Sequence, residues 1–90
     1  MRRPVQWVER LEEGVRLEVR VTFHGTRGLR WQSRRSDAGR WVYDFEPTAE
    51  QWDRLARKVE DRYRRRAAAW EDVLRVRAWR AAALGEGVGG

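Results

Sequence analysis

The chain has 90 residues and no cysteine, and its nineteen arginines and single lysine exceed its acidic residues to give a formal net charge of +6. This length allows one domain with a thin core, and the lack of cysteine excludes disulfides, thiolate metal sites and a cysteine nucleophile. No stretch approaches the roughly 18 apolar residues of a membrane span, and no apolar run follows Met1. We therefore expect a cytoplasmic protein with neither a membrane anchor nor a secretion signal.

The arginine surplus favours a polyanionic partner such as nucleic acid, or an acidic protein. A second explanation is coding bias, because arginine with abundant alanine, glycine and tryptophan is what a GC-rich genome produces. Six tryptophans are more than so small a core easily encloses. Some of them are therefore expected at an interface or on a ligand-facing surface.

Residues 5–46 alternate between apolar and polar side chains, which predicts four antiparallel strands at about 5–11, 15–24, 29–35 and 40–46. Short turns at 12–14, 25–28 and 36–39 contain the glycines that tight connections favour. Four strands joined in this way form a meander with one apolar face.

The alternation also predicts which side chains share a face of the sheet. In the second strand Leu17, Val19 and Val21 lie opposite Arg16, Glu18 and Arg20. In the third, Trp31 lies opposite the polar set of Arg30, Gln32 and Arg34. In the fourth, the pattern sets Trp41, Tyr43 and Phe45 on one side and Val42 and Asp44 on the other.

A helix is predicted to begin directly after the strands, with Thr48 as N-cap and Gln51 as its capping-box partner. From there to Leu84 the sequence contains neither glycine nor proline, and residues 85–90 are expected to form a disordered tail. An apolar stripe recurs after eleven residues, a period that keeps it on one side of a straight helix. Its members are Trp52, Ala56, Val59, Tyr63, Ala67, Trp70, Leu74, Ala78 and Ala81.

A continuous helix over 48–84 would be about 55 Å long, whereas strands of about seven residues span only about 24 Å. Either the helix breaks near residues 65–69 and folds back, or it projects and packs on a second copy. The run of alanines at 67–69 is a strong helix former, which favours one long helix and a homodimer. The expected fold is thus α+β, a single ββββα domain over 1–84, with Tyr63, Trp70, Leu74 and Trp79 at the dimer interface.

Catalytic side chains are scarce. His24 is the only histidine, so Ser33 and Ser36 have no triad partner. Asp44 and Glu46 have a spacing that a metal-dependent nuclease uses, but without further ligands an exposed pair is the default interpretation. We expect a protein that is not an enzyme and that has no catalytic residue, metal or cofactor.

Two groups of arginines are candidates for anion binding. Arg62 and the run 64–66 are best explained as a solvated helix face that nearby acidic residues balance. The polar side of the sheet is more suggestive, because guanidinium groups follow phosphates and a tryptophan stacks on unpaired bases. Trp31 or Trp41 can stack on a base only if a bulge or twist brings its ring to that side. Otherwise both rings belong to the core. The predicted nucleic-acid-binding residues are Arg16, Arg20, Arg30, Gln32, Arg34, Arg40, Trp31 and Trp41.

The stretch Phe45-Glu46-Pro47-Thr48-Ala49-Glu50-Gln51-Trp52-Asp53-Arg54-Leu55 resembles the strand-to-helix junction of the positive-cofactor-four type of transcriptional coactivator. That family has a Thr-x-Glu-Gln-Trp-x-x-Leu run after its fourth strand. The order of four antiparallel strands and one helix, over residues 5–66, is also similar to its Whirly and Pur-alpha relatives. The resemblance implies dimerisation through the helix and binding of single-stranded nucleic acid along a curved basic sheet.

Two hypotheses follow. In the first, the protein is a homodimeric, sequence-tolerant binder of single-stranded DNA or RNA that acts in transcription regulation. In the second, it is a structural or protein-interaction module that assembles through its long C-terminal helix and binds no nucleic acid.

Overall fold

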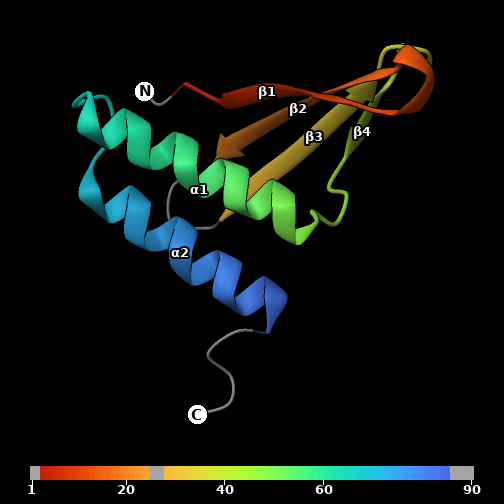
Figure 1. Ribbon diagram of the computed structural model, residues 1–90. Coiled ribbons are helices and arrows are strands. Elements are labelled where there is room, and N and C mark those ends of the chain that lie inside the picture. Colours follow the sequence, from red (N-terminus) through yellow and green to blue (C-terminus); the bar gives the residue numbers. More distant parts are fainter. Residues whose placement is uncertain (1–2, 25–27, 86–90) are drawn as a thin grey trace. The chain divides into compact units, whose positions relative to one another are not determined.

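A computed structural model of the chain describes residues 3–24 and 28–85 (Figure 1). It has the predicted α+β class, with four strands followed by helices. By its internal contacts the chain divides into two compact units, Met1–Glu46 and Pro47–Gly90, each of which we describe by itself. The expected single domain over 1–84 stays a prediction. No helix among the described residues has the length and apolar character needed to cross a membrane.

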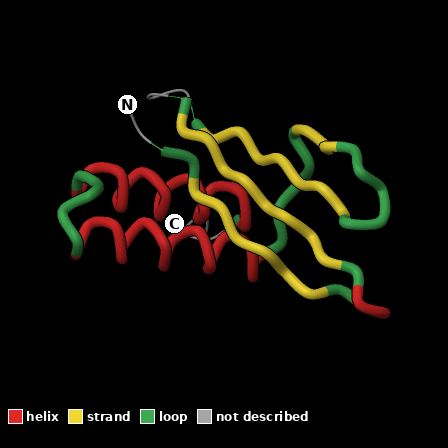
Figure 2. The backbone as a smooth tube through the Cα atoms, turned by 90° about the horizontal axis from the view of Figure 1, so that it is seen from above, coloured by secondary structure: helices red, strands yellow, loops and turns green. Residues whose placement is uncertain are grey.

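The first unit is an antiparallel sheet in which strands adjacent in sequence are adjacent in space, as Figure 2 shows, so the predicted meander is confirmed. A short 3-10 helix, η1 (Glu12–Gly14), connects the first two strands. The strands are β1 (Val5–Arg10), β2 (Arg16–Phe23), β3 (Leu29–Arg35) and β4 (Trp41–Tyr43).

The turns between the strands close by backbone hydrogen bonds. In the first, the amide of Leu11 donates to the carbonyl of Val15 at 2.7 Å, and Gly14 takes the positive φ that a tight connection requires. The predicted turn at 36–39 is present, with Gly39 at a φ of 66°. The predicted turn at 25–28 lies largely outside the described residues.

One face of the sheet is apolar, as the alternation predicts. The cross-strand pairs put Trp7 opposite Val19 and Val21 opposite Trp31 on this side. All four side chains are buried, and the rings of Trp7 and Trp31 meet edge to face with centroids 6.1 Å apart. Such aromatic contacts add about 0.5–1.5 kcal/mol to the burial of the rings.

The fourth strand departs from the prediction. It is only three residues long, because Asp44 adopts a left-handed backbone with a φ of 56° directly after Tyr43. Beyond this reversal Phe45 contacts Trp31 of the apolar face, with ring centroids 6.0 Å apart. Trp41 instead pairs with Arg34 on the other face. The expectation that Trp41, Tyr43 and Phe45 share one side is therefore wrong, since Asp44 breaks the alternation between them.

The second unit contains two helices, α1 (Ala49–Arg64) and α2 (Trp70–Leu84), which run side by side in opposite directions (Figures 1 and 2). The predicted start of α1 is confirmed in detail. The amide of Gln51 donates to Oγ1 of Thr48 at 3.1 Å, and the amide of Thr48 donates to Oε1 of Gln51 at 2.9 Å. This reciprocal pair satisfies two amides that a helix start otherwise leaves without partners.

The expected single long helix over 48–84 is wrong, and the alternative of a break near residues 65–69 is correct. Arg66 has a φ of 59°, and its amide donates to the carbonyl of Tyr63 at 2.9 Å. The next amide, of Ala67, donates to the carbonyl of Arg62 at 2.7 Å. These two bonds are a Schellman motif with arginine at the left-handed position that glycine usually occupies.

Packing of α2 along α1 accompanies the reversal. Leu55 and Val59 of α1 and Val73 and Val76 of α2 are buried. Each such side chain contributes about 1.5–3 kcal/mol when it leaves water, more than the roughly 1–2 kcal/mol of one left-handed residue. The helical preference of the alanine run is therefore overridden.

The predicted eleven-residue stripe does not continue onto α2. This helix buries Val73 and Val76, whereas Trp70 and Leu74, which the stripe would bury, are 42 % and 47 % exposed. Each of the two helices has 16 residues or fewer and is therefore about 24 Å long or less, which no longer exceeds the length of the strands. The length argument for a second copy is thereby removed, and the homodimer stays a prediction.

Candidate functional site

The side of the sheet opposite the apolar face carries most of its charge, and we call it the polar face. Across the strands its pairs include Arg10 with Arg16, Glu18 with Arg34, and Arg20 with Gln32. Its five arginines and one glutamate leave a formal excess of four positive charges. The polar face comprises Gln6, Val8, Arg10, Arg16, Glu18, Arg20, Thr22, Arg30, Gln32, Arg34, Trp41 and Tyr43.

Trp41, on the edge strand β4, contacts two arginines of this face. The Cζ atom of Arg20 lies 4.5 Å from the centroid of its ring, and that of Arg34 lies 4.9 Å away. An indole ring attracts a guanidinium at this range through its quadrupole, by about 0.5–1 kcal/mol at an exposed site. The ring thus holds two cations near each other that would otherwise repel.

The two guanidinium groups differ in their other partners. Arg34 donates from Nη2 to Glu18 at 2.9 Å, so its charge is partly neutralised. The Nε of Arg20 is buried and has no hydrogen-bond partner among the described residues. An unsatisfied buried donor costs about 1–3 kcal/mol, and no carboxylate in the described part of the chain neutralises Arg20 as Glu18 neutralises Arg34.

Tyr43, which the sequence-based site omitted, offers an accessible ring on the same face. It lies opposite Gln32 in the strand register, and 57 % of its surface is exposed. The signal that could have identified it is its spacing of two from Trp41, which holds for the part of β4 before Asp44.

The structure brings most of the predicted binding residues together and separates two. Arg16, Arg20, Arg30, Gln32, Arg34 and Trp41 share the polar face. The prediction that Trp31 belongs to the binding surface is wrong. Its ring lies buried on the apolar face between Trp7 and Phe45, because no bulge in β3 turns it to the polar face. Arg40 is exposed in the loop before β4.

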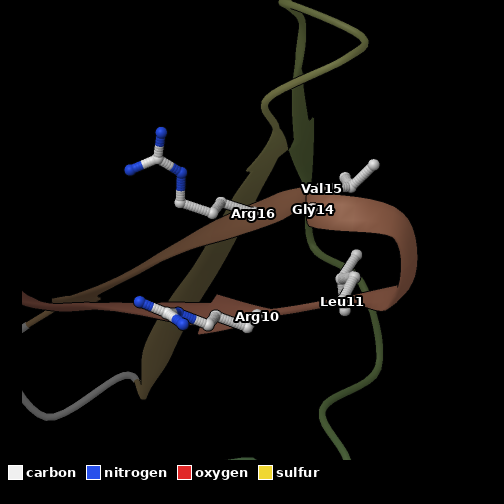
Figure 3. Close-up of a pocket in the computed structure, with 5 residues that line it drawn as sticks. All are labelled: Arg10, Leu11, Gly14, Val15 and Arg16. Carbon is white, nitrogen blue, oxygen red and sulfur yellow. The ribbon is translucent and has the colours of Figure 1, made fainter.

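A hollow of about 320 Å³ lies at the end of the β1–β2 hairpin. Figure 3 shows its lining residues, with the side chains of Arg10 and Arg16 extending to the same side of the hairpin. Leu11, Gly14 and Val15 form the remainder of its wall. Sequence reasoning missed Arg10, although the alternation of residues 5–11 assigns it to the same face as Val8.

Outside the polar face, Arg35 forms a closed pair with Asp37 in the turn before β4. Its Nε and Nη2 donate to the two carboxylate oxygens at 2.9 and 3.0 Å. The hydrogen bond from Arg35 lowers the pKa of Asp37 below its ordinary value. This arginine is therefore already engaged by a carboxylate.

The helix residues predicted for the dimer interface are only partly together. The ring of Tyr63 lies 5.0 Å from that of Trp70, and the guanidinium of Arg77 lies 5.2 Å from Trp70. Leu74 is exposed one turn further along α2. Trp79 is half-buried and forms no ring contact with Tyr63 or Trp70.

Among residues 3–24 and 28–85, no three histidine, aspartate or glutamate side chains are grouped so as to hold a metal ion. His24 is exposed at the end of β2. The expectation that the protein is not an enzyme stays a prediction.

Comparisons with known proteins give no relative: no protein-family model matches the chain, and no curated protein or solved structure matches it. The likeness to the positive-cofactor-four type of coactivator therefore rests on residues 45–55 and on the order of the elements.

Proposed function

We propose that the polar face binds single-stranded nucleic acid with little sequence preference. The observation that carries this proposal is the position of Trp41 within reach of both Arg20 and Arg34. A single strand presents phosphates and unpaired bases together, and a surface that combines guanidinium groups with aromatic rings suits both. Duplex DNA hides its base faces, so the rings would gain nothing from it.

The contributions divide by chemistry. Arg20 and Arg30, with Arg16 at the edge, supply charge to phosphates, which accounts for affinity but not for sequence preference. The exposed ring of Tyr43 stacks on a base, and Trp41 orients the two guanidinium groups beside it. Gln32, opposite both Arg20 and Tyr43, adds a neutral donor and acceptor within this surface.

The proposal predicts binding that weakens steeply with salt. Contacts to about five phosphates of a single strand give a slope near −3.5 when log K is plotted against log salt concentration. Tryptophan fluorescence of the whole chain, titrated with an unstructured oligonucleotide at low salt, measures both affinity and slope. Absence of any fluorescence change or binding at micromolar oligonucleotide would contradict the proposal.

A pair of matched variants separates a specific surface from general positive charge. Arg20→Gln with Arg30→Gln removes two charges from the polar face, and Arg54→Gln with Arg57→Gln removes two from exposed positions of α1. Loss of two phosphate contacts is expected to weaken binding on the order of tenfold or more in the first variant. Equal weakening in both variants would mean that net charge alone is responsible.

A second candidate function, assembly through the helices, is favoured by the exposed cluster of Tyr63, Trp70 and Leu74. Exposed aromatic and leucine side chains at helical spacing are typical of protein-interaction surfaces. Sedimentation of the wild-type chain and of Leu74→Glu tests it. A concentration-dependent increase in mass that the substitution abolishes supports assembly, and a monomer at every concentration contradicts it.

A further inference from the structure

We propose that Arg10 and Arg16 form a site for a phosphate monoester, namely the terminal phosphate of a bound nucleic acid strand. This inference rests on the proposed function. It assigns a role to the hollow at the end of the β1–β2 hairpin, whose lining includes Arg10 and Arg16 of the polar face (Figure 3).

The register of the two strands is the first argument. Arg10 lies directly opposite Arg16, and this is the only pair of like charges among the cross-strand partners of the described sheet. Side chains so placed have Cβ atoms about 4.5–5.5 Å apart, and like charges there are destabilising. The next pair on this face, Glu18 with Arg34, has the opposite arrangement and forms an ion pair.

The absence of a competing carboxylate is the second argument. Neither Arg10 nor Arg16 forms an ion pair with an acidic side chain in the described part of the chain. Glu18, the carboxylate of the neighbouring row, is engaged by Arg34 at 2.9 Å. Glu12 and Glu13 are exposed in the turn and do not line the hollow.

The charge of the ligand follows from that of the site. The guanidinium groups of these two cross-strand partners carry two positive charges, and each presents a planar fork that matches the oxygens of a phosphate. An internal phosphodiester carries one negative charge, whereas a phosphate monoester carries about 1.5–2 at neutral pH because its second pKa is near 6. A terminal phosphate therefore balances the pair, and the place of the hollow at a corner of the sheet leaves room for a strand to end there.

The walls of the hollow fit the same ligand. Leu11 and Val15 form an apolar side, and Gly14 brings no side chain into the space. A phosphate bound there remains open to the polar face, along which the rest of the strand runs.

The test compares oligonucleotides of one sequence that differ only in their ends: a 5′-phosphate, a 3′-phosphate, or hydroxyl groups at both. Binding is measured by fluorescence anisotropy with the wild-type chain, with Arg10→Gln and with the control Arg57→Gln. We expect one phosphorylated form to bind on the order of tenfold more tightly than the hydroxyl form, as one or two charge-assisted hydrogen bonds allow. The difference should vanish in Arg10→Gln and persist in Arg57→Gln.

The outcomes distinguish this proposal from the proposed function. If all three oligonucleotides bind equally, the terminal-phosphate site is wrong while single-strand binding stands. If none binds, the proposed function fails, and a second measurement decides the chemistry of the hollow: titration of the chain with inorganic phosphate, followed by the Nε resonances of Arg10 and Arg16. Saturable shifts of both resonances would support a phosphate site that takes a free ligand and would overturn the strand as its source. Unchanged resonances would overturn the phosphate site altogether.

Discussion

Arg20 and Trp41 come from strands that are not neighbours in the sheet, yet the Cζ atom of Arg20 lies 4.5 Å from the centroid of the Trp41 ring. The contact passes from β2 to β4 across β3. It therefore fixes the short fourth strand to the middle of the sheet, in addition to the backbone pairs that β4 makes with β3. One aromatic side chain thus contributes to both the order of the sheet edge and the orientation of the cations on it.

Replacement of Trp41 by alanine is expected to affect stability and binding together. Loss of two cation–π contacts lowers the free energy of unfolding by about 1–2 kcal/mol, and Arg20 and Arg34 lose their orientation. Urea unfolding and oligonucleotide anisotropy measure the two effects. Val42→Ala, a change at an exposed neighbour on the opposite side of β4, should leave the affinity within about twofold of wild type. An unchanged affinity in Trp41→Ala would remove the ring from the binding surface.

The fold-back of the helices has a direct test, because Asp53 and Arg80 form an ion pair of 2.7 Å between α1 and α2. On one continuous helix the same residues, 27 positions apart, would be separated by about 40 Å. The chain contains no cysteine, so spin labels attached to Asp53→Cys and Arg80→Cys report this distance without further changes. We expect a distribution centred below about 20 Å, and a maximum near 40 Å would restore the continuous helix.

The features of this protein that its sequence predicts correctly are those set by residues a few positions apart. The alternation of β2 and β3 follows from side chains two residues apart, and the capping box of Thr48 and Gln51 follows from residues three apart. The two wrong predictions about where elements end trace to a left-handed residue that is not glycine, Asp44 after β4 and Arg66 after α1. Aspartate is only enriched at positive φ and arginine is uncommon there, so the residue type alone does not predict either conformation.

The candidate site likewise has residues whose position the short-range pattern predicts and residues whose position it does not. Alternation assigns Arg16 and Arg20 of β2 and Arg30 and Arg34 of β3 to one face, whereas the face of Trp41 depends on where β4 ends. Trp31 and Trp41 are equivalent as residue types and ten positions apart, so composition does not separate the core ring from the surface ring. Only the register, which pairs Trp31 with Val21 and Trp41 with Arg34, distinguishes them.

Arg66→Gly is expected to stabilise the chain. Arg66 adopts a φ of 59°, a region that costs an L-residue about 1–2 kcal/mol and glycine nothing. The greater freedom of glycine in the unfolded chain offsets about 0.5–1 kcal/mol of this gain, so the free energy of unfolding should rise by roughly 0.5–1 kcal/mol. Arg65→Gly is the matched control, because Arg65 has a φ of −89° and glycine there brings only the entropic cost. Thermal or urea unfolding of both variants should show changes of opposite sign.

The pair of Arg35 and Asp37 predicts a dependence on pH. The hydrogen bond from Arg35 lowers the pKa of Asp37 in the folded chain, so the carboxylate stabilises the turn at pH above its ordinary pKa. That contribution is lost as the pH falls through the lowered value. Carbon-13 titration of the Asp37 carboxyl measures its pKa directly, and Arg35→Gln should return it towards the ordinary range. An unaltered midpoint in Arg35→Gln would show that the pair does not persist in solution.

A side-chain N-cap, which α1 has in Thr48, is lacking at the start of α2 and can be added by substitution. Ala69 is the N-cap of α2 with an extended backbone (φ −81°, ψ 153°) and offers no side-chain acceptor to the first turn. Ala69→Ser supplies a hydroxyl oxygen to those amides, which is worth about 1 kcal/mol in the free energy of unfolding. The same substitution one residue earlier, Ala68→Ser, introduces a hydroxyl outside the N-cap position and should change stability by less than about 0.5 kcal/mol. If α2 instead continued from α1, residue 69 would lie inside a helix, where serine is a weaker helix former than alanine, and Ala69→Ser would destabilise the chain.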